Sequence, residues 1–142
     1  MAEIRTVAAQ TAPRRLALFL DGTYDEQRGN TNVWRAKCLC ATNGTDGRDQ
    51  LTFYSAGLGT TLGERIRGGA FGYGIDDVVI AAYEWLVETY QEGDEIFLFG
   101  FSRGAMTARS LAGLVSRCGL LELGAPLGVK QLYDRYRRGD AC

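Results

Sequence analysis

Ser102 stands in the pattern Gly100-Phe101-Ser102-Arg103-Gly104, which has the G-x-S-x-G spacing of a hydrolase nucleophile. A serine hydroxyl becomes a good nucleophile only when a base takes its proton and hydrogen-bond donors stabilise the oxyanion that forms. A helix that begins near Arg103 would offer its first backbone N–H as one such donor. The chain contains no histidine, so the usual base is missing from it. A purely structural glycine turn is the alternative interpretation.

The sequence on both sides of Ser102 supports the nucleophile interpretation. Residues 95–99, of which the last four are apolar, are predicted to form the third strand, and apolar residues then recur from 105 to 115 at helical spacing. A strand, a sharp turn and a helix are the setting in which this motif acts, and few chance matches would fall there. We therefore predict a nucleophile elbow after the third strand, with Gly100 and Gly104 as its structural glycines.

Other strands and helices alternate along the chain. Residues 16–20 are apolar on both faces, as in the centre of a parallel sheet, and residues 51–56 have the aromatic and β-branched content of a strand. A strong helical pattern begins at Ile75, and weaker patterns predict helices at 33–39 and 129–138. This alternation predicts an α/β fold, a parallel sheet with helices on both faces and a site at the carboxyl ends of the strands. We expect residues 1–142 to form a single domain, although three strands make a thin sheet.

The glycine-rich stretch from Gly57 to Gly74 joins the second strand to the long helix. Its glycines do not follow the order of the dinucleotide fingerprint, and it lacks the G-K-[ST] ending of a phosphate loop, which disfavours a nucleotide site. A loop of this length is usually functional, so we predict a lid or pocket wall over Ser102. A tightly packed structural loop is the alternative. Arg65 in this stretch is a candidate for an anionic headgroup, although exposed arginines more often remain solvated.

The composition excludes several classes of function. The chain has 142 residues, of which 46% are hydrophobic, and a net charge of −1, so it is globular and has no overall attraction to nucleic acid. The first 16 residues lack the apolar region of a secretory signal, and no transmembrane segment is predicted. The spacing of the four cysteines disfavours a zinc site, and we expect free thiols in a reducing, cytoplasmic compartment. We expect neither a metal nor another cofactor.

Three motifs together resemble an α/β-hydrolase family that carries an uncharacterised-domain label, DUF2235, and includes the type VI secretion phospholipase effectors. The motifs are D-G-T at 21–23, G-G-A-F-G at 68–72 and G-F-S-R-G-A at 100–105, and the resemblance covers Leu16 to about Arg138. It implies a partial α/β-hydrolase fold in which the 16–20 strand lies between the other two. The implied substrate is an ester or a lipid, and the implied location includes export without a cleaved signal peptide.

The resemblance also implies roles for individual residues. Ser102 matches the nucleophile, and the backbone N–H groups of Thr23 and Arg103 match the two donors of the oxyanion hole. The candidate residues for substrate binding are Asp21 and Gly22, which match the floor of the pocket, together with Arg65, Gly69 and Phe71.

The family's catalytic acid and histidine follow the serine along the chain, and here the sequence departs from the family. No histidine is present, and the sequence stops before the strand that would carry the acid. Asp94 precedes its strand, and Asp134 and Asp140 lie in the tail, so none of them completes a triad. We expect the N-terminal portion of a serine hydrolase that needs a complementing C-terminal half. The alternative is a non-catalytic binding or partner module, and the open side of the third strand predicts self-association or poor solubility.

Overall fold

Three parallel strands form the centre of the fold. The computed structural model describes residues 12–22, 30–57 and 74–142. Within them the strands are β1 (Arg15–Leu20), β2 (Gln50–Ser55) and β3 (Glu95–Gly100), in the order β2-β1-β3. In the parallel register Leu18 of β1 lies beside Phe53 of β2 and Leu98 of β3. The predicted α/β fold class and the central place of the 16–20 strand are confirmed.

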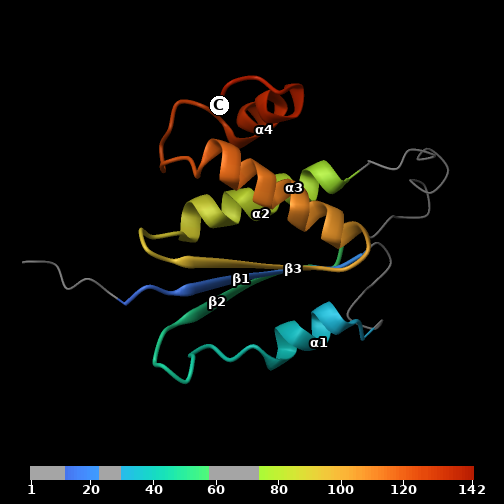
Figure 1. Ribbon diagram of the computed structural model, residues 1–142, viewed down its shortest axis with the longest axis vertical. Coiled ribbons are helices and arrows are strands. Elements are labelled where there is room, and N and C mark those ends of the chain that lie inside the picture. The colour runs from blue at the N-terminus through green and yellow to red at the C-terminus, as the bar shows by residue number, and fades with distance from the viewer. Residues whose placement is uncertain (1–11, 23–29, 58–73) are drawn as a thin grey trace, which may run out of the picture.

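Helices cover both faces of this sheet (Figure 1). Helices α2 (Ile75–Thr89) and α3 (Arg103–Cys118) lie on one face, with α4 (Val129–Arg138) above them, and α1 (Asn32–Leu39) lies on the other face. Parallel strands need long crossover connections, and placing helices on both faces buries a central strand completely. The predicted helices at 33–39 and 129–138 and the helix start at Ile75 are confirmed, and these bounds lie within one residue of the observed ones.

The alternation of side chains along β1 creates two cores of unequal size. Leu16 and Leu18 point into the larger core and are fully buried there against α2 and α3, whose contributing residues include Val79, Leu86, Leu111 and Leu114. Ala17 and Phe19 point to the other face, where Val33 of α1 covers them. The larger core holds α3 firmly on the sheet, and α3 begins at the residue after Ser102.

The phenol of Tyr83 ties α2 to the segment after α3. Its hydroxyl donates to the Gly119 carbonyl at 2.9 Å and accepts from the Leu121 N–H at 3.0 Å. Burial raises the pKa of Tyr83, so this hydroxyl stays protonated. The pair of hydrogen bonds satisfies a polar group inside an apolar core.

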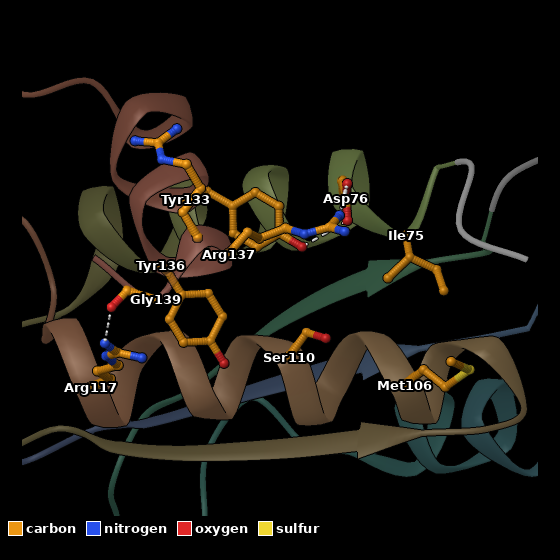
Figure 2. A pocket seen from close by; sticks show the side chains of 10 residues that line it. Ile75, Asp76, Met106, Ser110, Arg117, Tyr133, Tyr136, Arg137 and Gly139 are labelled. Carbon is orange, nitrogen blue, oxygen red and sulfur yellow. Dashed lines mark hydrogen bonds and ion pairs between the residues drawn. The ribbon is translucent and has the colours of Figure 1, made fainter. Parts of the chain in front are cut away.

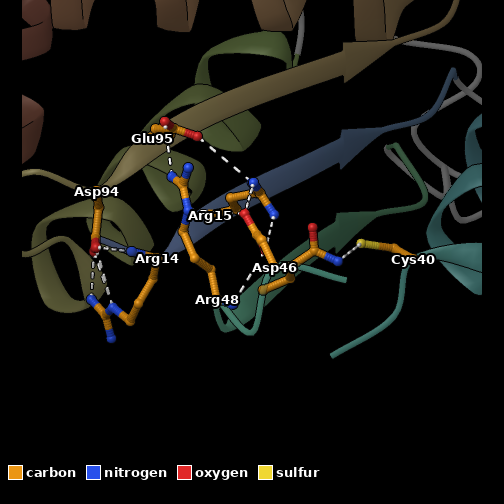
Figure 3. Close-up of polar contacts among 8 residues, drawn as sticks. Arg14, Arg15, Cys40, Asp46, Arg48, Asp94 and Glu95 are labelled. Atoms are coloured by element: carbon orange, nitrogen blue, oxygen red, sulfur yellow. Dashed lines mark hydrogen bonds and ion pairs between the residues drawn. The ribbon is translucent and has the colours of Figure 1, made fainter. Parts of the chain in front are cut away.

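Ion pairs join the segments at the amino ends of the strands (Figure 3). Asp94, whose side chain is 2% exposed, pairs with Arg14 at 2.6 Å and also accepts from the Arg14 backbone N–H at 2.8 Å. Arg15 pairs with Asp46 at 2.6 Å, and Arg48 pairs with Glu95 at 3.1 Å. Asp94 therefore lies at the end of the sheet opposite Ser102, as its position directly before β3 requires, and its role is structural.

The expectation of four free thiols is wrong for two of the cysteines. Cys118, at the end of α3, forms a disulfide with Cys142, with Cα atoms 5.2 Å apart, whereas Cys38 and Cys40 are free. The sequence suggested no pair because these two cysteines are 24 residues apart and follow no recognisable motif. The disulfide fastens the segment that follows α4 to α3.

Candidate active site

Ser102 occupies a strained turn between β3 and α3. Its φ and ψ angles are 52° and −124°, and Asn30 is the one other residue besides glycine with positive φ in the described part of the chain. A side chain in this region is sterically unfavourable and is commonly retained where function requires it. Ser102 is exposed, and its hydroxyl does not cap the helix that it precedes. The turn thus presents a hydroxyl that no neighbouring backbone group among the described residues has engaged.

The two glycines that flank Ser102 are required by contact distances. A Cβ atom on Gly104 would lie 2.0 Å from the Leu20 carbonyl oxygen, and one on Gly100 would lie 2.4 Å from the Gly104 carbonyl oxygen. Both distances are far below any van der Waals contact, and the opposing atoms belong to the backbone. Gly100 and Gly104 therefore allow β1, β3 and the start of α3 to approach one another as closely as they do.

Backbone hydrogen bonds fix this turn against the central strand. The Phe101 N–H donates to the Leu20 carbonyl at 3.1 Å, and the Gly104 N–H donates to the Phe101 carbonyl at 2.8 Å. The Arg103 N–H makes no hydrogen bond to another described residue. As the first N–H of a 16-residue helix, it carries part of the positive end of the helix dipole. A free donor thus stands directly beside the serine.

The carboxyl end of β1 lies under the site. The Asp21 N–H donates to the Ser55 carbonyl at 2.9 Å, which extends the β1–β2 pairing by one residue. A Cβ atom on Gly57 would lie 2.4 Å from the Gly22 carbonyl oxygen, so the Asp21–Gly22 backbone is held closely from the β2 side. From the β3 side, a Cβ atom on Gly104 would lie 2.7 Å from the Asp21 carbonyl oxygen. The Asp21–Gly22 backbone is therefore closely packed between Gly57 and Gly104.

The Asp21 side chain is buried on the α1 side of the sheet. It is 2% exposed, and its Oδ2 accepts from the Thr31 hydroxyl at 2.6 Å and from the Tyr54 hydroxyl at 3.0 Å. Its Oδ1 is buried without a hydrogen-bond partner among the described residues. Thr31 also accepts from the Trp34 N–H and caps α1. Asp21 thus connects the ends of β1 and β2 with the start of α1.

Several predicted site residues fall outside the described part of the chain, namely Thr23, Arg65, Gly69 and Phe71. The structure brings Ser102 and Arg103 together with Asp21 and Gly22 at the carboxyl ends of the strands. Sequence reasoning missed Tyr54 as a partner of Asp21. The alternation in β2 indicates which residues share a face with Tyr54, but its contact with Asp21 depends on the register of β1 and β2, in which Tyr54 lies beside Phe19.

The carboxylates of the C-terminal segment are engaged locally. Asp134 pairs with Lys130 within α4 at 2.9 Å, and Asp140 pairs with Arg138 at 2.8 Å. Neither makes a hydrogen bond to Ser102 in the described structure, and Asp94 is at the far end of the sheet. The base and the acid of a catalytic triad are not supplied by the described residues around Ser102.

A cavity of about 600 Å³ opens between α2, α3 and α4 (Figure 2). Met106 and Ile75 lie at its end nearer the start of α3, and Arg117 lies at the other end. Arg137 pairs with Asp76, which also accepts from the Tyr133 hydroxyl at 2.8 Å. Burial, with this hydrogen bond to Asp76, raises the pKa of Tyr133 to about 12. Asp76, Tyr133 and Arg137 of this lining thus join α4 to α2.

The architecture is a partial α/β fold, with Ser102 at the turn between a strand and a helix. The model of the family described as "T6SS, Phospholipase effector Tle1-like, catalytic domain" matches residues 14–141, and the chain belongs to this family.

One curated relative is itself without an assigned function. The chain is 30% identical over 142 residues to "Uncharacterized protein YEL023C" of Saccharomyces cerevisiae. The match covers 88% of this chain and 20% of the yeast protein, so the chain spans about a fifth of its relative's length. No solved structure matches the chain. In the described part of the chain, no helix is long and apolar enough to cross a membrane, and no group of side chains could hold a metal ion.

Proposed function

We propose that this chain carries the nucleophile and the oxyanion hole of a serine hydrolase that cleaves ester bonds in lipids. The proposal rests on the backbone conformation of Ser102, which has a φ of 52° and a ψ of −124°. At the positions two residues before and two residues after Ser102, this turn accommodates only glycine. Membership in a phospholipase effector family supports a lipid ester as the substrate class.

The proposed reaction is acyl transfer through the serine. Ser102 Oγ attacks the ester carbonyl carbon while a base takes the hydroxyl proton, and the N–H groups of Arg103 and Thr23 donate to the oxyanion. Collapse of this intermediate breaks the ester C–O bond and releases the alcohol, which receives the proton. Water then attacks the acyl-serine, releases the fatty acid and restores Ser102. The positive end of α3 favours the oxyanion at both stages.

The usual base of this mechanism is missing from the 142 residues, because they include no histidine. We propose that a complementing polypeptide segment supplies it together with the acid. The absence of histidine also favours a second candidate function, that of a non-catalytic protein that keeps the pocket for binding. Removing one member of a catalytic triad leaves only a small residual rate, so the isolated chain should hydrolyse esters hardly at all.

The first experiment tests the complete activity. The gene product is purified from its own host, its intact mass is measured, and it is assayed for release of fatty acid from phosphatidylcholine vesicles. We expect a mass above 15.5 kDa and a hydrolysis that Ser102→Ala abolishes and Ser110→Ala, a change farther along the same helix, preserves. A larger product that cleaves neither phospholipids nor simple esters would refute the hydrolase and leave the binding module.

The second experiment examines the elbow without any base. A Ser102→Cys variant of the 142-residue chain, with Cys38 and Cys40 changed to serine, is alkylated with iodoacetamide across a range of pH. A thiol at a helix N-terminus titrates below the ordinary value of about 8.5. Ser110→Cys, in the middle of the same helix, is the matched control and should titrate higher. Equal midpoints for the two thiols would show that the turn does not stabilise an anion.

A further inference from the structure

One carboxylate joins the two ends of the segment that leads from β1 to α1. Residues 23–29 of this segment lie outside the described part of the chain, but the residues before and after them are described. Asp21 follows β1 directly, and Thr31 is the N-cap of α1. The Thr31 hydroxyl donates to Asp21 Oδ2 at 2.6 Å, a length typical of a hydroxyl that donates to a carboxylate. This hydrogen bond holds the two ends of the segment together.

A second hydroxyl holds the same carboxylate from the side of β2. The Tyr54 hydroxyl donates to Asp21 Oδ2 at 3.0 Å, and Trp34 of α1 packs edge-on against the Tyr54 ring with centroids 4.9 Å apart. The Asp21 backbone N–H donates to the Ser55 carbonyl at 2.9 Å. Neighbouring elements therefore hold both the side chain and the backbone of Asp21.

The Asp21 carboxylate is not placed to contact a substrate. It lies on the face of the sheet that α1 covers and is 2% exposed, whereas the turn at Ser102 leads into α3 on the other face (Figure 1). Its Oδ1 is buried without a hydrogen-bond partner among the described residues. Such an atom is unfavourable for folding and is often retained where the group has a function besides stability. Any effect of this carboxylate on the reaction acts through the backbone that it holds.

That backbone leads directly to the second donor proposed for the oxyanion hole. A peptide bond is planar, so the Gly22 carbonyl and the Thr23 N–H share one plane. The carbonyl is closely packed, since a Cβ atom on Gly57 would lie 2.4 Å from its oxygen and 2.8 Å from its carbon. Gly22 has no side chain to restrict its own dihedral angles. The direction of the Thr23 N–H therefore depends on the contacts of Gly57 and on the anchoring of Asp21.

We propose that Asp21 is a positioning residue, whose carboxylate holds the Gly22–Thr23 peptide so that the Thr23 N–H donates to the oxyanion. The inference rests on the proposed function, because this donor matters only if an oxyanion forms at Ser102. An oxyanion hole works through donors that are in place before the reaction. Loosening an anchor of the donor therefore weakens binding of the transition state more than binding of the substrate.

The experiment changes the two hydroxyl partners, because substitution of the buried Asp21 would itself destabilise the fold. Tyr54→Phe and Thr31→Val each remove one hydrogen bond to Oδ2 in the full gene product, and kcat and KM are measured on phosphatidylcholine vesicles. Loss of one oxyanion donor lowers kcat by about 10²–10³-fold, so displacing one should lower kcat by about tenfold or more and change KM by less than about twofold. Thr31→Ser, which keeps the hydroxyl, should retain kcat. Tyr54→Phe leaves the α1 cap in place and so separates positioning from capping.

Inhibition by a long-chain trifluoromethyl ketone gives a readout that a loss of stability alone does not change. Ser102 Oγ adds to the ketone carbonyl carbon, the base takes the hydroxyl proton, and the carbonyl oxygen becomes an oxyanion. The inhibition constant should therefore rise by the same factor as kcat falls. Tyr83→Phe is the matched control, because it removes a phenol that makes two hydrogen bonds elsewhere in the core. It should lower the urea midpoint and leave kcat and the inhibition constant unchanged.

The outcomes separate this inference from the proposed function. Circular dichroism first checks that each variant is folded under the assay conditions. The positioning role is wrong, and the hydrolase stands, if Ser102→Ala abolishes hydrolysis while Tyr54→Phe and Thr31→Val lose no more kcat than Tyr83→Phe. A loss in Thr31→Ser as large as that in Thr31→Val would also overturn the inference. Hydrolysis that Ser102→Ala leaves unchanged would instead refute the proposed function, and the inference with it.

Discussion

The backbone of Ser102 is strained, and this conformation exposes the serine hydroxyl. A residue in such a sparsely populated region costs about 1–3 kcal/mol, which the surrounding packing must offset. The helix α3 contributes that packing through Leu111 and Leu114, which are fully buried against the sheet. This core maintains the strained backbone conformation, and the Ser102 side chain is not part of it. A reaction or a substitution at Ser102 should therefore leave the fold intact.

The close approach at Gly104 gives a prediction at the residue scale. Gly104→Ala should destabilise the fold by about 3 kcal/mol or more, because its Cβ would meet the Leu20 carbonyl oxygen at 2.0 Å. Urea unfolding followed by circular dichroism measures the change. Gly128→Ala is the control, since the nearest atom to its Cβ would be a Gln131 side-chain oxygen at 3.9 Å. Equal stability of the two variants would mean that the elbow is looser than this geometry.

At the scale of elements, periodicity in the sequence predicted the strands and helices but few of the contacts between them. The apolar run of β1 and the helical spacing of α2 are signals carried by neighbouring residues, and the structure confirms the strand and the helix that they predict. The joining of α3 to the C-terminal segment by Cys118 and Cys142 depends on how the chain returns in space. The same is true of Tyr54, whose approach to Asp21 follows from strand register and not from spacing.

The disulfide gives a prediction at this scale. Closing a loop between residues 24 apart stabilises the folded chain by about 3 kcal/mol through the entropy of the unfolded state. Reduction should therefore lower the urea midpoint in a variant in which Cys38 and Cys40 are serine, so that only this disulfide responds. A thiol count by mass spectrometry confirms the oxidised state first. An unchanged midpoint on reduction would mean that other contacts hold the C-terminal segment, such as those of Tyr133 with Asp76.

At the scale of the whole molecule the two ends of the sheet have different roles. The amino ends of the strands are joined by ion pairs that include Asp94 with Arg14 and Asp46 with Arg15. The carboxyl ends carry Ser102 and the locked Asp21–Gly22 backbone. A rigid base beneath loops that bear the site is the usual arrangement in α/β proteins. Changes at the amino end should therefore alter stability without changing the chemistry of Ser102.

The pKa values of two carboxylates at that end predict how stability depends on pH. Burial raises the pKa of Asp94, but hydrogen bonds from Arg14 and Gln91 outweigh it, and its pKa lies below the ordinary value. The hydrogen bond from Arg15 lowers the pKa of Asp46 to about 2 from 3.8. Groups whose pKa is lower in the folded state stabilise it above the unfolded pKa and lose that effect as pH falls through the folded one.

The contribution of these two carboxylates to stability should therefore be fully present above about pH 5 and should be lost as the pH falls from about 4 to about 2. Asp94→Asn should cost about 1–3 kcal/mol at pH 7, because it weakens the hydrogen bonds of a buried group, and should flatten the acid part of the curve. Asp134→Asn is the matched control, because its side chain is 45% exposed and its one ion pair among the described residues is with Lys130 on the same helix. Thermal unfolding across this pH range measures both variants. If Asp94→Asn kept the full acid dependence of the unchanged chain, the ion pair with Arg14 would not be the contact that holds the base of the sheet.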